Sequence, residues 1–296
     1  MKTLRSWRAL LVREYLEHRI AFQWVPLGIL ALLTIAALSA LGLHRIRIFD
    51  DLPFIVAPKI FEMGYLILLC LWLAYLAVTL FFFFGDAFSA DRRNNAMLFW
   101  KSMPVSDLKI LVSKVISGLL LFPLIIFVFG MISGVIYYLV FNLAAFFMPA
   151  LGFLSPVEAL SSFVQISLYG VIFYGLAMLW YAPYFVWVGG LSTVFGRWSL
   201  PLAFVIPGVL GVIENVALYG NGPTGGYVLN YIGERWNFAL SEADLTVMLL
   251  DTRTFNAPFH ISRLVQQIDW PQMAIGLVFA AVLTWLASEY RRRRIA

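Results

Sequence analysis

Long uncharged stretches of apolar residues alternate with short charged segments along the chain. A helix needs about 20 apolar residues to cross a hydrocarbon layer of about 30 Å, and four stretches clearly reach that length. A fifth is shorter, but it opens with Trp270 and Pro271, an interfacial aromatic residue and a helix-starting proline. A sixth, interrupted by Pro201 and Pro207, is long enough if it extends to Tyr219. The predicted spans are residues 21–43, 63–85, 115–141, 163–190, 198–219 and 270–288.

The composition supports a membrane location. Apolar residues make up 62% of the 296 residues and charged residues only 12%, whereas soluble domains average about 25% charged residues. Such a chain lacks the polar side chains that cover a water-facing surface. We therefore predict an all-α integral membrane protein in which residues 1–296 form one transmembrane domain.

The positions of lysine and arginine predict the orientation, because cytoplasmic segments carry an excess of both. With both termini inside, 15 of the 21 basic residues fall in inner segments. The same asymmetry explains the net charge of +5 without a nucleic-acid ligand. Both termini are therefore expected to be cytoplasmic, in a multi-pass protein of the plasma membrane, such as the bacterial inner membrane.

Residues 1–20, before the first span, have an amphipathic pattern. Trp7, Leu11 and Tyr15 recur at helical spacing on one face, while most of the arginines lie off it. The pattern predicts a helix that lies in the cytoplasmic interface of the membrane. A cytosolic extension of the first span is the alternative that the pattern leaves open.

The cytoplasmic segment 86–114, between the second and third spans, is the most polar of the inner segments. Pro104 divides it into two short helices, because a residue before proline avoids the helical conformation, and Ser106 is placed to cap the second. An apolar cluster at residues 97–100 lies between basic residues. This cluster is a candidate docking surface, although tryptophan also commonly lies in the lipid headgroup layer.

The largest outer segment is the loop 220–269. It opens with a glycine-rich stretch, and the capping-box spacing of Ser241 and Asp244 predicts a short helix after it. Glu214, just before the loop, is the acidic residue closest to the interior of a predicted span. A carboxylate in a membrane is a functional candidate, so Glu214 is a candidate gate. The alternative places it in water at the mouth of the fifth span.

No motif for catalysis, nucleotide binding or metal binding occurs in the sequence. It contains no P-loop, H-E-x-x-H or C-x-x-C pattern, and its three histidines are far apart. Cys70 is the only cysteine, which excludes an intramolecular disulfide. Asp86 has no second carboxylate at a similar depth to form a catalytic pair. We expect no catalytic residue, metal site, cofactor or enzymatic activity in this chain.

Residues 90–106 read A-D-R-R-N-N-A-M-L-F-W-K-S-M-P-V-S, and a lysine follows at position 114. This segment resembles the permease subunits of ABC transporters of the type-2 exporter family. Those permeases typically have an amphipathic N-terminal helix and six spans, and they carry a similar cytoplasmic segment between spans two and three. The chain departs from the family pattern at Asn94 and Asn95 and in its larger loop before the last span.

The resemblance implies that two permease chains form one transport path, each coupled to a separate cytoplasmic ATPase. ATP and Mg²⁺ would then bind to that partner. The resemblance also implies a coupling helix within segment 86–114 that enters a groove of the ATPase. The residues expected to carry this coupling are Asp91, Arg92, Arg93, Phe99, Trp100, Lys101, Pro104, Val105 and Ser106.

Two other functions remain open. An ion-coupled secondary transporter needs ionisable residues inside its spans, and the sequence offers only Glu214 for that role. A non-transporting membrane scaffold has no sequence signature that would distinguish it. The expected function is that of an exporter permease, and the sequence does not specify its substrate.

Overall fold

The computed structural model describes residues 2–42, 57–90, 105–219, 226–236, 238 and 254–294. Helices contain almost all of these residues, and no strand occurs among them. The prediction of an all-α protein is therefore confirmed.

Ten α-helices occur among the described residues. They are α1 (Lys2–Arg19), α2 (Val25–Gly42), α3 (Ala57–Ala87), α6 (Asp107–Ile116), α7 (Phe122–Phe147), α8 (Pro156–Phe195), α9 (Ser199–Glu214), α10 (Tyr227–Trp236), α12 (Ala257–Gln267) and α13 (Trp270–Arg294). Three π-helical turns continue the helices before them: η1 (Ile20–Trp24), η2 (Ser117–Leu121) and η5 (Asn215–Tyr219). Two 3₁₀ turns complete the described elements: η3 (Pro149–Leu151) and η4 (Gly196–Trp198).

Five continuous helical stretches of the described chain are long and apolar enough to cross a membrane. They are Arg5–Leu41, Ala57–Ala87, Asp107–Phe147, Pro156–Leu218 and Trp270–Arg293. The fourth stretch joins α8 to α9 through η4, so it contains both the fourth and the fifth predicted spans. Each predicted span thus overlaps one of these stretches.

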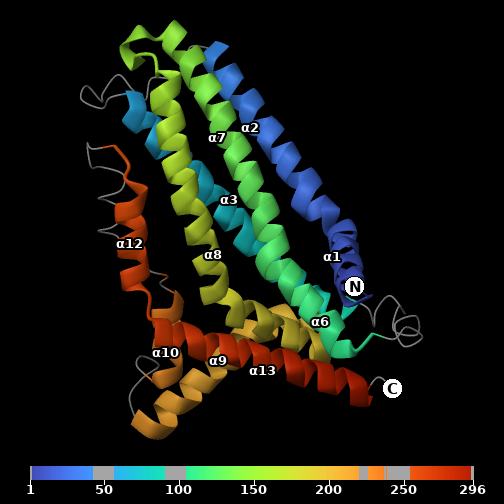
Figure 1. Cartoon of the computed structure of the whole chain (residues 1–296). Helices are drawn as coiled ribbons and strands as arrows, with labels where there is room; N and C mark the ends of the chain where they lie inside the picture. The colour runs from blue at the N-terminus through green and yellow to red at the C-terminus, as the bar shows by residue number, and fades with distance from the viewer. Residues whose placement is uncertain are drawn as a thin grey trace.

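α3 and α8 run in the same direction, and α9 begins where α3 ends, as hydrogen bonds at the two ends of the bundle show. At one end, the Ser199 hydroxyl at the start of α9 donates to the Gly85 carbonyl near the end of α3, at 2.9 Å. At the opposite end, the Ser162 hydroxyl near the start of α8 donates to Glu62 near the start of α3, at 2.8 Å. Figure 1 shows both chain termini at the same end, the lower right of the view. We call this the terminal end of the bundle.

α3 is the central helix and packs against α7 on one side and α8 on the other (Figure 1). Gly134 of α7 faces the ring of Tyr65 so closely that a Cβ atom would overlap it, and small residues permit such approaches in membrane helices. The Tyr65 hydroxyl bonds with Ser167 of α8 at 2.8 Å, and Trp72 donates to Ser133 of α7 at 3.2 Å. Polar groups inside the bundle are thus paired across helices.

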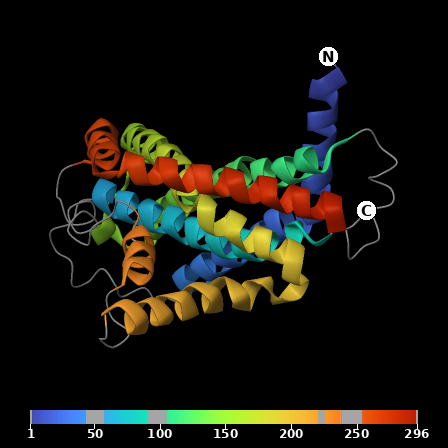
Figure 2. The ribbon, with the colours of Figure 1, turned by 90° about the horizontal axis from the view of Figure 1, so that it is seen from below.

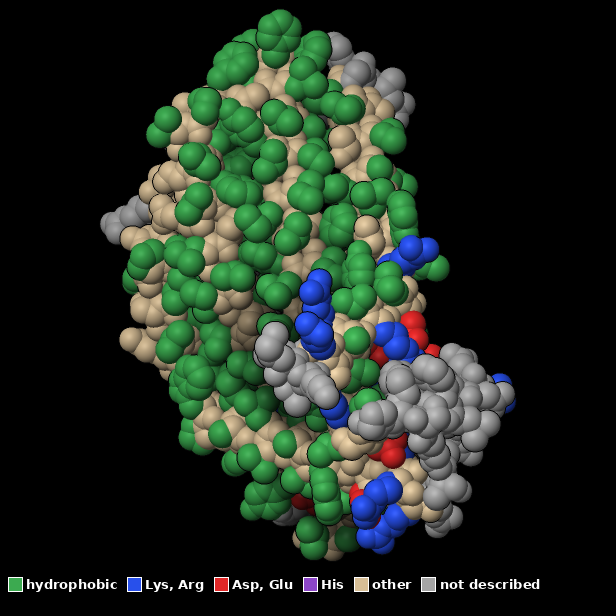
Figure 3. All heavy atoms as spheres, turned by 45° about the vertical axis from the view of Figure 1, so that its right-hand side comes forward, with side chains coloured by type: hydrophobic (Ala, Val, Ile, Leu, Met, Phe, Trp, Pro, Cys, Tyr) green, Lys and Arg blue, Asp and Glu red, His purple; other side chains and the backbone are tan. Residues whose placement is uncertain are grey.

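Apolar side chains cover the outside of the bundle. Leu32, Leu71 and Val278, on three different helices, are 66%, 57% and 64% exposed. On the face in Figure 3, hydrophobic side chains fill the upper part, while charged side chains gather in the lower part. Soluble monomers rarely expose contiguous apolar surface on this scale. The surface is therefore that of a protein embedded in a membrane.

Two bends shape the terminal end. α8 is bent (Figure 1), and Pro183 lies inside its second half. Proline removes a helical hydrogen bond and crowds the preceding turn, which bends a helix. α8 ends at Gly196, whose φ of +57° favours glycine. At the π-helical turn η1 the chain changes direction, so that α1 points away from the bundle at an angle to α2 (Figure 2). α1 is therefore not a straight extension of the first span.

The helix predicted after Ser106 is α6, which runs without a break through η2 into α7, the helix of the predicted third span. The structure corrects one sequence prediction. The sequence predicts that 220–269 is a loop with one short helix, but the segment contains α10 and α12. Both are short helices with polar residues, which a search for long apolar runs does not detect. The helix predicted after Ser241 lies outside the described residues.

Candidate functional site

Only part of the predicted coupling segment is described by the structure. Val105 and Ser106 are described, at the start of α6. The other residues predicted to couple to an ATPase lie outside the described residues: Asp91, Arg92, Arg93, Phe99, Trp100, Lys101 and Pro104.

Ser106 is the N-cap of α6, as the sequence predicts. Its backbone is extended, with φ −73° and ψ 148°, and its hydroxyl oxygen accepts the Lys109 backbone N–H at 3.4 Å. Val105 is half-buried and packs against Leu10 of α1 and Ile110 of α6. The predicted coupling segment therefore ends in a helix that is fixed against α1.

A buried ion pair joins α1 to α6. The Lys114 ammonium donates to the Glu14 carboxylate at 3.0 Å, and each side chain is 1% exposed. Loss of either partner would leave an uncompensated charge inside the protein, which is strongly unfavourable. The pair therefore fixes α1 and α6 in one relative position.

Two further contacts extend this assembly. The Lys109 ammonium donates to the Ser6 hydroxyl and lies 5.2 Å from the centre of the Trp7 ring. From α13, Arg291 is 1% exposed and lies 3.7 Å from Asp107. We call α1, α6 and the part of α13 that contains Arg291 the terminal platform. Segments from both ends and the middle of the chain meet in it.

The outer side chains of the terminal platform combine charge with apolar surface. Val12 and Leu16 of α1 are 47% and 54% exposed. The exposed basic side chains are Arg5, Arg8, Arg19, Arg292 and Arg293. A mixed basic and apolar surface of this kind suits either a protein partner or anionic lipid headgroups.

Glu214, the candidate gate, caps α10. Its two carboxylate oxygens accept the backbone N–H groups of Tyr227 and Val228, both at 2.8 Å. A carboxylate at a helix N-terminus satisfies unpaired N–H groups and interacts favourably with the helix dipole. The side chain is half-buried. Its gating role stays a prediction, and the contacts show that it positions α10 against α9.

Glu62 is a buried acid that the sequence analysis missed. It lies inside α3 and is 1% exposed. Its carboxylate accepts the Phe255 backbone N–H at 3.1 and 3.2 Å, and Lys59 lies 3.6 Å away. Glu214 is therefore not the only acidic residue near the interior of a span. The spacing of Lys59 and Glu62, three residues apart, is the signal that indicates a helical ion pair.

One group of described side chains has the spacing of metal ligands. The ligand atoms of Glu14, Glu17 and His18 lie within 4.8 Å of one another. However, Glu14 pairs with Lys114, and Glu17 pairs with Arg13 at 2.7 Å. The two basic side chains already neutralise both carboxylates, so we assign no metal to this group.

Comparisons with known protein families, curated proteins and solved structures gave no match. The function is therefore inferred from the geometry of the chain itself.

Proposed function

We propose that the chain is the permease subunit of an ATP-driven ABC exporter in the plasma membrane. It would form the transport path with a second permease chain and couple to a cytoplasmic ATPase subunit that binds ATP and Mg²⁺. The observation that carries the proposal is the terminal platform, which adjoins the ABC-permease-like segment. That segment leads directly into α6, and α6 is fastened to α1 by the buried pair of Glu14 and Lys114.

The terminal platform suggests how a movement of the ATPase would be transmitted to the membrane spans. α6 continues through η2 into α7, and α1 continues through η1 into α2. Phe22 in η1 stacks on Phe122 directly after η2, with ring centres 3.8 Å apart. A displacement of the coupling segment would therefore move two membrane helices together. Rigid-body motion of this kind is a common way to switch between access states.

The test is whether a nucleotide-dependent partner binds at the coupling segment. The chain, purified in a mild detergent, should copurify with a protein that contains a P-loop and has vanadate-sensitive ATPase activity. Trp100→Ala should lower the amount of bound ATPase about tenfold, since interface tryptophans contribute strongly to binding. Trp285→Ala is the matched control, because Trp285 is 54% exposed on α13 and lies outside the platform contacts.

Two results would contradict the proposal. One is transport by the purified chain without nucleotide or partner, which would indicate an ion-coupled carrier. The other is a copurifying ATPase that Trp100→Ala and Trp285→Ala release equally, because the coupling segment would then have no specific part in binding.

A further inference from the structure

Arg235 of α10 is a fully buried cation. It is 1% exposed, and it is the only buried residue among the α10 side chains that the structure describes. Helices normally dock through an apolar face. α10 does contact α9 through the Glu214 cap and through Leu229, which faces Gly211, but the side chain that it buries fully is a cation. A buried charge is costly, and in a membrane protein it is a functional candidate.

The guanidinium of Arg235 bridges two other helices. It donates to the Trp180 carbonyl of α8 at 3.1 Å, to the Gln272 carbonyl of α13 at 2.9 Å and to the Tyr231 hydroxyl at 3.1 Å. It also lies 4.8 Å from the centre of the Trp180 ring, and the Trp180 indole N–H donates to the Arg235 carbonyl at 2.7 Å. α10 is thereby tied to α8 one turn before Pro183 and to the first turn of α13.

These contacts hold the cation without neutralising it. All the acceptors of the Arg235 guanidinium are neutral, no described acidic side chain pairs with it, and its buried Nε has no hydrogen-bond partner. Burial therefore removes the water that would hydrate this full charge, and this desolvation costs free energy. Hydrogen bonds and the contact with the Trp180 ring offset part of this cost. The docked state therefore retains part of the desolvation cost, and a hydrated guanidinium would not bear that cost.

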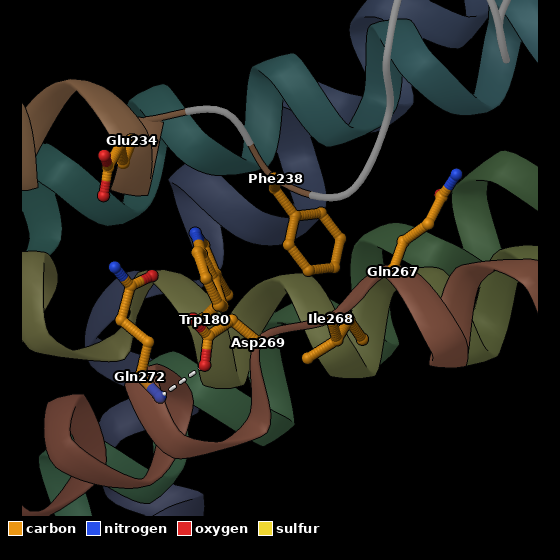
Figure 4. Close-up of a pocket in the computed structure, with 7 residues that line it drawn as sticks. All are labelled: Trp180, Glu234, Phe238, Gln267, Ile268, Asp269 and Gln272. Atoms are coloured by element: carbon orange, nitrogen blue, oxygen red, sulfur yellow. Dashed lines mark hydrogen bonds between the residues drawn. The ribbon is translucent and has the colours of Figure 1, made fainter.

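A cavity of about 220 Å³ lies beside this contact (Figure 4). Trp180 and Gln272, which bind Arg235, also line the cavity. Glu234 and Phe238 line it from α10 and the residues after it, and Asp269 lines it just before α13. Glu234, Gln267 and Asp269 in its lining are exposed, so the cavity is open to solvent, and the position of α10 helps to determine its width.

We propose that Arg235 fastens α10 reversibly to the bend of α8 and to the start of α13. Withdrawal of its guanidinium into water frees this part of α10 from α8 and α13, while the Glu214 cap keeps the start of α10 on α9. The adjoining cavity then becomes wider, and the contact between α8 and α13 through Arg235 is lost. This device does not depend on an ATPase partner, so its failure would leave the proposed function untouched.

The chain offers a matched pair of glycines for the test. A Cβ atom at Gly276 of α13 would overlap the Arg235 guanidinium, whereas one at Gly233 of α10 would meet nothing within 4 Å. Gly276→Ala therefore displaces the Arg235 guanidinium but retains its charge, and Gly233→Ala is its control. Arg235→Met removes the charge at similar length.

The readout is the reactivity of a cysteine in the cavity. Gln272→Cys in a Cys70→Ser background replaces a cavity-lining side chain and retains the carbonyl that binds Arg235. In lipid nanodiscs, its reaction with a water-soluble maleimide should be about tenfold faster with Arg235→Met or Gly276→Ala, and unchanged with Gly233→Ala. Amide hydrogen exchange should accelerate in α10 and remain unchanged in α3.

Two outcomes would overturn the proposal. If Arg235→Met and Gly276→Ala leave the labelling rate unchanged, Arg235 does not control access to the cavity. If exchange in α3 accelerates by the same factor as in α10, Arg235 belongs to the general core and is not a local fastening.

Discussion

Buried charged side chains are few among the described residues, and most of them join elements that are distant in the sequence. Glu14 and Lys114 join α1 to α6, Glu62 joins α3 to the residues before α12, and Arg235 joins α10 to α8 and α13. Well-packed apolar residues often stabilise such positions as well as ion pairs do. The interactions of these charges depend strongly on direction, however, and we infer that they specify how the helices are placed.

The first prediction concerns the buried pair. Lys114→Met should lower the free energy of unfolding by about 3–5 kcal/mol, because the Glu14 carboxylate would stay buried without its cation. The double variant Glu14→Gln/Lys114→Met should recover much of this loss. Thermal unfolding in detergent micelles, followed by circular dichroism, measures both effects.

The neighbouring pair of Arg13 and Glu17 is the control. It is formed on one helix and its side chains are 27% and 41% exposed. Glu17→Gln should therefore cost only about 0.3–0.5 kcal/mol. Equal losses for Lys114→Met and Glu17→Gln would refute the structural importance of the buried pair.

At the scale of helices, the sequence predicts those elements whose length the membrane dictates. The six apolar runs overlap the five long helical stretches because a span must satisfy its own backbone in lipid. α10 and α12 escape prediction because no comparable length rule applies to short helices with mixed polarity. The N-cap at Ser106 predicts the start of α6, but the continuity of α6 with the third span escapes prediction, because Lys109 and Lys114 interrupt the apolar run. Lys114 nevertheless lies in the interior once Glu14 neutralises it.

The second prediction concerns the N-cap of α6. Ser106→Ala should destabilise the first turn of α6 by about 1 kcal/mol, because the Lys109 N–H loses its acceptor. Amide hydrogen exchange should be faster in α6, while Ser106→Asp should retain the protection. Ser155→Ala removes the equivalent cap of α8 and should leave α6 unaffected. Unchanged exchange in Ser106→Ala would show that contacts with α1 alone hold α6 in place.

At the scale of the whole molecule, the main feature that a linear pattern cannot reveal is which segments meet. Glu14 and Lys114 are 100 positions apart, and Glu62 and Phe255 are 193 positions apart. Local periodicity predicts neither contact. It does predict the alternation of the spans, and alternation with an even number of crossings places both termini at one end. The terminal platform exists because of that arrangement.

The third prediction concerns the side of the membrane on which the terminal platform lies. Single cysteines in a Cys70→Ser background report it: Phe153→Cys lies at the end opposite the platform, and Arg197→Cys lies at the terminal end, next to the α9 start that contacts α3. Both positions are exposed. In intact cells, a membrane-impermeant maleimide should label Phe153→Cys, and it should label Arg197→Cys only after permeabilisation. The reason is the excess of lysine and arginine at the terminal end. The reverse result would place the platform outside the cell, where no ATP-dependent partner could act on it, and would exclude the proposed exporter.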